Sequence, residues 1–379
     1  MPVDRLLPTR EARDLIDMVR DVCAKELDPR VVDCEKHQEY PEGLFGTLGE
    51  LGLLSLPYPE EQGGGGQSYE VYLQVLEELG AQWAAVAVAV SVHSLSCYAM
   101  SAYGTDEQQQ QWLPRMLGGN HIGAYSLSEP QAGSDAAALR CAATPIDGGY
   151  RINGSKAWIT HGGRADFYTL FARTGTGQRG ISCFVVPADT EGLSFGKPEE
   201  KLGLRAIPTT AAYYDNAFIA DEQRIGDEGE GLAIAFSALD SGRLGIAAVA
   251  TGLAQRALDD AVAYAKERHT FGKKIIDHQG LGFLLADMAA AVESARATYI
   301  DAARRRDAGL PYSRQASVAK LIATDAAMKV TTDAVQVFGG YGYTTEYPVE
   351  RYMREAKIMQ IFEGTNQIQR LVISRHLAR

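Results

Sequence analysis

The chain has 379 residues, and its 46% hydrophobic and 22% charged content allows two or three subdomains with extensive cores. The formal net charge of -11 argues against nucleic acid or an anionic membrane as a partner, because both attract clustered positive charge. The five cysteines are odd in number and form no C-x-x-C pair, which indicates the reduced thiols of a cytoplasmic protein.

Helical spacing of apolar residues runs from Glu11 to about Leu117, with one break at the Pro- and Gly-rich stretch PYPEEQGGGGQS, a predicted loop. The segment after this loop predicts a helix that ends at Gly80. The apolar run AAVAVAV is far shorter than the roughly 20 residues of a membrane span and predicts a buried helix. The N-terminus shows no signal-peptide pattern. We expect an N-terminal α-helical domain over residues 1–118.

Residues 119–228 have the composition of a β-domain. Short runs rich in β-branched and aromatic residues (YRING, DFYTLFAR, ISCFVVP, AAYYDNAFI) are separated by Gly, Asp, Pro and Thr turns. Because no helices intervene, an antiparallel β-barrel or sandwich is predicted. The stretch GTGQRG matches G-x-G-x-x-G, but a strand follows it where a dinucleotide fingerprint needs a helix. We interpret it as a hairpin loop.

Residues 229–379 are predicted to form a C-terminal four-helix bundle. The segments TGLAQRALDDAVAYAKER and LGFLLADMAAAVESARATYIDAARRR carry apolar stripes at helical spacing, and the second ends at DAGLP. A further helix is predicted at ASVAKLIATDAAMKVTTDAVQVF, so an up-down bundle is the simplest arrangement. The predicted fold class is therefore α+β and multidomain, with helices before and after a β-domain.

One acidic residue near the C-terminus stands out. In IFEGTNQIQR, Glu363 follows the apolar residues Ile361 and Phe362 and precedes a Gly-Thr turn. Thr365 predicts a helix N-cap, and an acid beside a helix N-terminus is stabilised by the unpaired N–H groups. A carboxylate shielded from water is also a stronger base, and the apolar neighbours Ile361 and Phe362 fit this requirement. The residues alone leave both roles open, and the two can coexist.

Three other stretches are unusual: YSLSEPQAGSD, KAWITHGG and QVFGGYGY. Each has a structural interpretation, as a hydroxyl-capped turn, a core Trp and a glycine-rich helix end respectively. Together with ALDSGR, ERHTFGKKIIDHQ and IFEGTNQIQR, in this order along the chain, they resemble the acyl-CoA dehydrogenase family over essentially the whole sequence. The fold implied by the resemblance agrees with the composition of the three parts.

The resemblance implies an FAD enzyme that removes the α-proton and β-hydride of an acyl-CoA thioester. The implied enzyme forms a trans-2-enoyl-CoA and passes electrons to an electron-transfer flavoprotein. The family's base is the acid of this C-terminal motif, here Glu363. In the isovaleryl and long-chain branches the base instead comes from the position of Gly242. The chain therefore resembles the short, medium and branched short-chain type, and a short or branched short acyl group is the expected substrate.

The resemblance also assigns residues to the cofactor and the substrate. The flavin is expected between the β-domain and the bundle, while the motifs ERHTFGKKIIDHQ and QVFGG reach FAD from a neighbouring subunit. A homo-oligomer, most simply a homotetramer, is therefore implied. The residues assigned to FAD are Tyr125, Leu127, Ser128, Ser134, Trp158, Ile159, Thr160, Arg268, Thr270, Phe271, Gln279, Gln336, Gly339, Gly340, Thr365 and Gln367. Those assigned to the substrate are Ser134, Asp240, Arg243 and Gly364.

Three alternatives stay open. Arg243 is equally well interpreted as half of a structural ion pair. An oxygen-using relative, such as an acyl-CoA oxidase or a flavin monooxygenase, shares the fold, although Glu363 counts against a monooxygenase. A catalytically silent CoA-binding scaffold is a third interpretation, and the intact motifs count against it. No metal site is expected.

Overall fold

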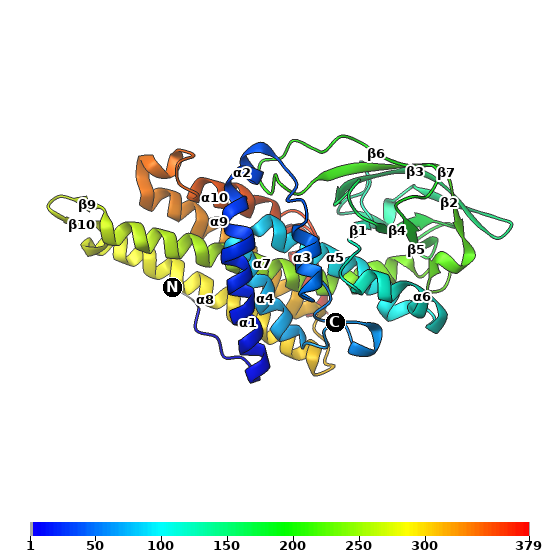
Figure 1. The fold of residues 1–379 in the computed structure, drawn as a ribbon, viewed down its shortest axis with the longest axis horizontal. Coiled ribbons are helices and arrows are strands. Elements are labelled where there is room, and N and C mark those ends of the chain that lie inside the picture. The colour runs from blue at the N-terminus through cyan, green and yellow to red at the C-terminus, as the bar shows by residue number, and fades with distance from the viewer. Residues whose placement is uncertain (1–2, 379) are drawn as a thin grey trace.

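The computed structural model describes residues 3–378 and shows the predicted order of helices, β-domain and helices (Figure 1). The N-terminal helices are α1 (Arg10–Val22), α2 (Asp28–His37), α3 (Leu44–Glu50), α4 (Tyr69–Gln82), α5 (Ala84–Tyr103) and α6 (Asp106–Leu117). The predicted fold class is confirmed, and the limits 118 and 228 stay predictions.

The β-domain contains strands β1 to β8. They are β1 (Gly123–Ser126), β2 (Ala142–Ile146), β3 (Gly149–Thr160), β4 (Phe167–Arg173), β5 (Ile181–Pro187), β6 (Leu193–Phe195), β7 (Thr209–Ala220) and β8 (Arg224–Ile225). Their order in the sheet is β6-β7-β3-β2-β4-β5-β8, and β1 pairs with β4. Most pairs are antiparallel, but β1 and β2 each pair with β4 in parallel. The GTGQRG stretch joins β4 to its antiparallel partner β5, which confirms the predicted hairpin.

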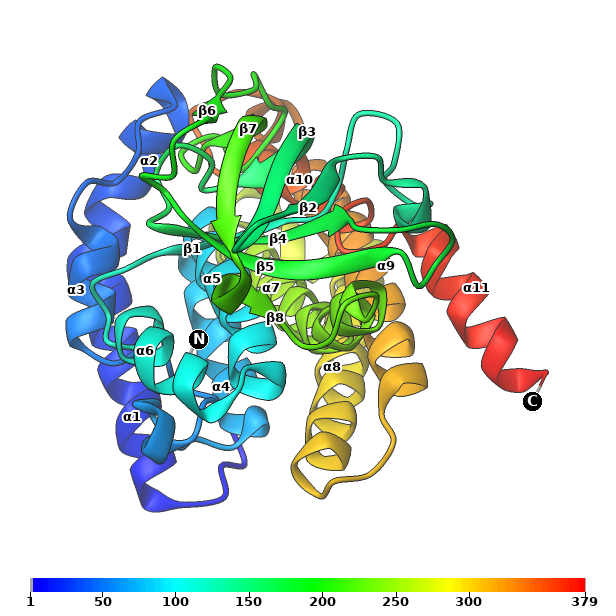
Figure 2. The same cartoon turned by 90° about the vertical axis from the view of Figure 1, so that its right-hand side faces the viewer.

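The C-terminal part begins with one long helix and continues as a bundle (Figures 1 and 2). Its elements are α7 (Gly231–Glu267), β9 (His269–Thr270), β10 (Lys273–Lys274), α8 (Gln279–Asp307), α9 (Ser313–Phe338), α10 (Val349–Met359) and α11 (Asn366–Leu377). Helices α7 to α10 pack on one another, and α11 extends away from the body (Figure 2). The short β9–β10 hairpin lies at the end of the bundle opposite the β-domain (Figure 1).

The first and last thirds of the chain share one hydrophobic core, in which α4 and α5 pack against α7. Both α5 and α7 are long and apolar enough for a membrane span, but 89% and 72% of their most apolar windows are buried inside the protein. The prediction that α4 ends at Gly80 is wrong. A Cβ at Gly80 would lie 2.9 Å from the Val249 carbonyl oxygen, so this glycine allows α4 and α7 to approach closely.

Candidate active site

Glu363 lies in the short loop between α10 and α11. Its φ of +51° and the φ of +90° at Gly364 turn the chain sharply, and such values cost a non-glycine residue conformational energy. The Thr365 side chain then accepts a hydrogen bond from the Ile368 N–H at 3.2 Å, which confirms the predicted N-cap of α11. The strained loop holds the Glu363 side chain away from α11 and turns it toward α7.

Both carboxylate oxygens of Glu363 are buried, and neither accepts a hydrogen bond from residues 3–378. Burial raises the pKa of this carboxyl group to about 7, and the charges of Lys320 and Arg243 only partly offset that effect. The dry environment does not come from Ile361, which is 48% exposed, so the sequence-based argument from this neighbour is wrong. An unpaired buried carboxylate titrating near neutral pH is the arrangement expected of a general base.

A buried lysine, Lys320, which lies outside the sequence motifs, holds this loop in place. Lys320 of α9 donates to the Gly364 carbonyl oxygen at 2.9 Å and to the Asn366 Oδ1 at 3.0 Å. Gln369 also donates to the Gly364 carbonyl, at 2.8 Å. Lys320 lies on the buried Ala316, Ala323 and Ala327 stripe of α9. A lysine on an apolar stripe signals a buried polar partner.

Gly242 of α7 faces the Glu363 carboxylate. A Cβ built on Gly242 would lie 2.2 Å from the Glu363 Oε2 and 3.3 Å from the Leu95 Cδ1. The next residues on this helix include Arg243, which is buried and pairs with Asp240 through its Nη1, while its Nε has no partner among the described residues. The structural interpretation of Arg243 as an ion-paired residue is therefore observed, and its charge also reaches Glu363.

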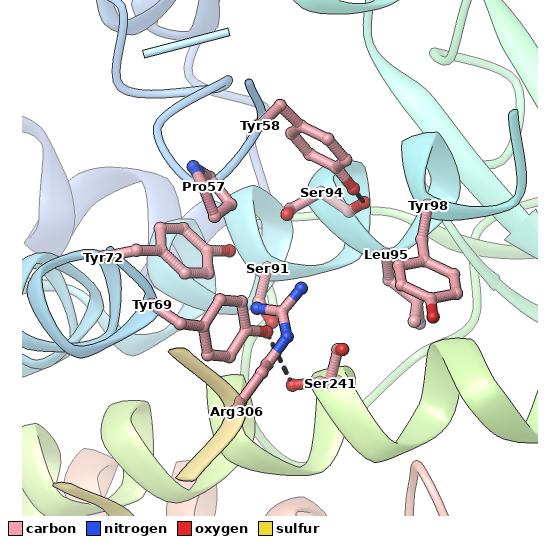
Figure 3. Close-up of a pocket in the computed structure, with 11 residues that line it drawn as sticks. Pro57, Tyr58, Tyr69, Tyr72, Ser91, Ser94, Leu95, Tyr98, Ser241 and Arg306 are labelled. Atoms are coloured by element: carbon pink, nitrogen blue, oxygen red, sulfur yellow. Dashed lines mark hydrogen bonds between the residues drawn. The ribbon is translucent and has the colours of Figure 1, made fainter. Parts of the chain in front are cut away.

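A small cavity borders Gly242, the residue that faces the Glu363 carboxylate. Figure 3 shows side chains that line this cavity. Its walls come from the loop before α4 and from helices α4, α5, α7 and α8. The lining residues are Pro57, Tyr58, Tyr69, Tyr72, Ser91, Ser94, Leu95, Tyr98, Ser241, Gly242 and Arg306.

The SLSEP turn is held in place by a buried ion pair. Lys156 of β3 lies 2.8 Å from the Glu129 Oε1 and also donates to the Leu127 carbonyl oxygen at 2.9 Å. The Glu129 Oε2 accepts from the Arg140 N–H at 2.6 Å, and the Oε1 also accepts from the Cys141 N–H at 2.9 Å. The Ser128 carbonyl oxygen of the turn also accepts a hydrogen bond from the Ala157 N–H at 2.9 Å. Lys156 therefore ties the turn to the strand segment that carries Trp158.

Trp158 stands out from the sheet. The β3–β7 pairing is irregular between Lys156 and Ile159, and Trp158 in this irregularity has a φ of +63°. Its residue is 63% exposed, whereas the adjacent Ile159 is buried in the β-domain core. A β-bulge re-aims a side chain in this way. An exposed indole ring beside a fixed turn is a surface on which a flat ring system can stack.

The other predicted residues of this region have different environments. Thr160 is half-buried at the end of β3, and Ser134 is exposed in the loop after the SLSEP turn. The Tyr125 hydroxyl donates to the Ala235 carbonyl oxygen on α7 at 3.2 Å, which joins the β-domain to the long helix. Gln367 is exposed in the first turn of α11.

A second group of predicted cofactor residues gathers at the opposite end of α7. Arg268 and Phe271 lie at the β9–β10 hairpin, where Phe271 is 97% exposed. The end of α9 reaches the same place, because Phe338 stacks on Tyr264 at 4.1 Å. This group contains Arg268, Thr270, Phe271, Gln279, Gln336, Gly339 and Gly340, and all of its members except the half-buried Thr270 are exposed.

One chain does not bring the two groups together. The stretch of α7 from Ala235, which bonds Tyr125, to Arg268 corresponds to about 50 Å of helix. A single dinucleotide cannot span that length. Each group by itself fits part of FAD, since the first offers an exposed indole and the second offers a cation beside Gly339 and Gly340, where a Cβ would meet open space.

Three family models together match most of the chain. Models described as the acyl-CoA dehydrogenase N-terminal, middle and C-terminal domains match residues 9–120, 124–217 and 229–378. The short-chain specific acyl-CoA dehydrogenase of Clostridium acetobutylicum is 43% identical over 374 residues, which cover 98% of this chain and 99% of that protein.

Two solved structures have nearly the same fold. Butyryl-CoA dehydrogenase from Megasphaera elsdenii has a TM-score of 0.97 and 40% identity, with both chains covered completely. A chain from the structure of the electron transferring flavoprotein of Acidaminococcus fermentans, determined to address flavin-based electron bifurcation, also has a TM-score of 0.97, with 42% identity over 99% of this chain and 100% of that chain.

Proposed function

The chain belongs to the acyl-CoA dehydrogenase family, and we propose that it dehydrogenates a short-chain acyl-CoA thioester to the trans-2-enoyl-CoA with FAD as its cofactor. The observation that carries this proposal is the Glu363 carboxylate. It is buried, lacks a hydrogen-bond partner in the described chain and lies against Gly242, which lines a small cavity.

Glu363 is the base that takes the α-proton. Its raised pKa of about 7 suits abstraction beside a thioester carbonyl at neutral pH, because the base is then both ionised and sufficiently basic. When bound, FAD would supply the acceptor for the β-hydrogen and its electron pair. The Cα–H bond electrons left behind form the new double bond. The positive charges of Lys320 and Arg243 keep part of the Glu363 population ionised despite its burial.

The relatives support a short acyl chain. The Clostridium acetobutylicum relative is named short-chain specific, and the Megasphaera elsdenii structure is a butyryl-CoA dehydrogenase. We therefore assign a short straight or branched acyl group, with butyryl-CoA as the reference substrate.

The two separated groups of predicted cofactor residues support an oligomeric holoenzyme. In this proposal the SLSEP turn, Trp158 and Thr160 hold the flavin, and Arg268 with the glycines after α9 of a second copy hold the phosphate and adenine side. A homotetramer is the simplest assembly. The similarity to a chain in an electron transferring flavoprotein structure supports such a flavoprotein as the electron acceptor. We assign the enzyme to the cytoplasm, as its unpaired cysteines predict.

The test is an assay of the purified protein with butyryl-CoA and an artificial electron acceptor. We expect a yellow protein with flavin absorbance near ~450 nm, crotonyl-CoA as the product and little hydrogen peroxide in air. Replacing Glu363 by Gln should keep the flavin and lower turnover by at least about 10²-fold. Absence of flavin would support a silent scaffold, and stoichiometric peroxide would support an oxidase.

A further inference from the structure

The cavity that Gly242 lines is also bordered by Ser241, Tyr69 and, from the C-terminal end of α8, Arg306. Figure 3 shows Ser241, Tyr69 and Arg306 close together. Tyr69 contacts both Ser241, which is next to Gly242, and Arg306. Its hydroxyl donates to the carbonyl oxygen of Ser241 at 2.9 Å. The guanidinium group of Arg306 stacks on the face of the same ring, with its Cζ 3.5 Å from the ring centroid. An acyl chain that passes Gly242 therefore meets Tyr69 and then Arg306.

Arg306 differs from the two arginines that precede it. Arg304 pairs with Glu70 at 2.8 Å, and Arg305 pairs with Asp301 at 2.9 Å. Within residues 3–378 no carboxylate oxygen lies within 4.0 Å of the Arg306 guanidinium, which lines the cavity instead. The adjacent Asp307 is occupied, since it accepts hydrogen bonds from the Tyr69 and Glu70 N–H groups.

The other polar groups of the cavity do not neutralise this charge. Burial raises the pKa of the Tyr58, Tyr69 and Tyr72 hydroxyls, so all three are neutral at neutral pH. Stacking on Tyr69 stabilises the guanidinium group, but by less than it costs to remove water from an unpaired cation. Arg306 therefore keeps its charge at low cost only while polar or hydrated space remains beside it.

We propose that Arg306 sets the upper limit of acyl-chain length by closing the cavity with a charge that an apolar chain cannot cover. This inference rests on the proposed function and narrows its substrate class to acyl groups that end before Arg306. A short chain leaves the guanidinium in contact with water and the neighbouring hydroxyls. A longer apolar chain displaces that water and leaves the cation unsolvated, which is exclusion by a repulsive element.

The experiment replaces Arg306 by Met and measures kcat/KM for the straight-chain series from butyryl-CoA to octanoyl-CoA. We expect the octanoyl-to-butyryl ratio to rise at least about 10-fold, the discrimination that a few unfavourable apolar contacts provide. Arg306→Lys keeps the charge and should keep the preference for butyryl-CoA. Arg305→Met, which breaks only an exposed pair on the same helix, is the matched control and should leave the series unchanged.

Binding is measured separately from turnover. Glu363→Gln and the double variant Glu363→Gln, Arg306→Met are titrated with the same series by calorimetry, and the double variant should bind octanoyl-CoA at least about 10-fold more tightly relative to butyryl-CoA. An unchanged binding series would overturn the assignment of Arg306 even if butyryl-CoA is oxidised. Faster turnover of succinyl- or glutaryl-CoA than of butyryl-CoA would also overturn it, because Arg306 would then bind a substrate carboxylate. Loss of all turnover in the unmodified protein would instead contradict the proposed function, and the binding series still decides the inference.

Discussion

Gly242 and Glu363, which are 121 positions apart in the chain, occupy one site: a Cβ at Gly242 would lie 2.2 Å from the Glu363 Oε2. The resemblance identified these two positions as alternative sources of the base in different branches of the family. Their contact supplies a physical reason, because a side chain at position 242 would occupy the volume that the Glu363 carboxylate fills. A carboxylate on the loop therefore requires a residue without a side chain on α7.

Replacing Gly242 by Ala tests this relationship. The added methyl group displaces the carboxylate, and a misplacement of about 1 Å costs on the order of 10²-fold in rate. We expect kcat/KM for butyryl-CoA to fall by about this factor while the flavin content stays the same. Gly46→Ala is the matched control, since a Cβ there meets no atom within 4 Å. Unimpaired turnover of Gly242→Ala would show that the carboxylate acts from another position.

The pH dependence of catalysis follows from the raised pKa of Glu363. Only the ionised carboxylate accepts a proton, so kcat/KM should increase with pH and level off above an apparent pKa of about 7. Because Lys320 titrates nearby, this apparent value belongs to the coupled pair. A profile of kcat/KM for butyryl-CoA between pH 5 and 9 gives the value directly. A flat profile across this range would contradict the burial of the base.

Stability should change with pH in the opposite direction. The carboxyl pKa is about 7 in the folded protein and 4.5 when unperturbed, so ionisation is disfavoured by folding. Its destabilising effect is absent below the lower value and complete above the higher one. Glu363→Gln should therefore raise the free energy of unfolding by up to about 3 kcal/mol at pH 8 and by little at pH 4.5. Urea denaturation at the two pH values measures this difference, and equal effects at both would contradict it.

Local patterns predicted much of this site, because their partners are close in the sequence. The N-cap of α11 needs only Thr365 and Ile368, and the hairpin at GTGQRG needs only its two adjacent strands. Interactions between distant residues were not predictable in this way. Which residue of α9 faces the Glu363 loop depends on how the helices pack, so Lys320 carried no local signal beyond its place on an apolar stripe.

Close packing also explains the predictions that were wrong. Gly80 is typical of a helix end, yet it lies inside α4. A glycine is needed at this position because α7 passes too close to leave room for a side chain. Ile361 precedes the base in sequence but is exposed, and the buried carboxylate instead faces Gly242 of α7. Sequence neighbours are thus a poor guide to the environment of a residue in a strained loop.

Lys320 should tune the base as well as fasten its loop. Its positive charge favours the ionised form of Glu363, so Lys320→Met should move the apparent pKa of kcat/KM upward by about 1 unit or more. Loss of its two hydrogen bonds should also lower the free energy of unfolding. The control is Lys329→Met on the same helix, which breaks an exposed pair with Asp333. A purely structural role would change stability and leave the kinetic pKa where it is.

The buried Lys156–Glu129 pair should control both the stability of the β-domain and the retention of FAD. Lys156→Met leaves the Glu129 carboxylate buried without its cation, a change that typically costs about 3–5 kcal/mol. It also frees the Leu127 carbonyl and loosens the turn beside Trp158, so the flavin should dissociate faster on dilution. Denaturation and the recovery of flavin fluorescence measure the two effects. Lys197→Met, at an exposed position in the same domain, should change unfolding by less than about 0.5 kcal/mol. If Lys156→Met lowers the stability but leaves flavin retention normal, the ion pair acts in folding alone and not in cofactor binding.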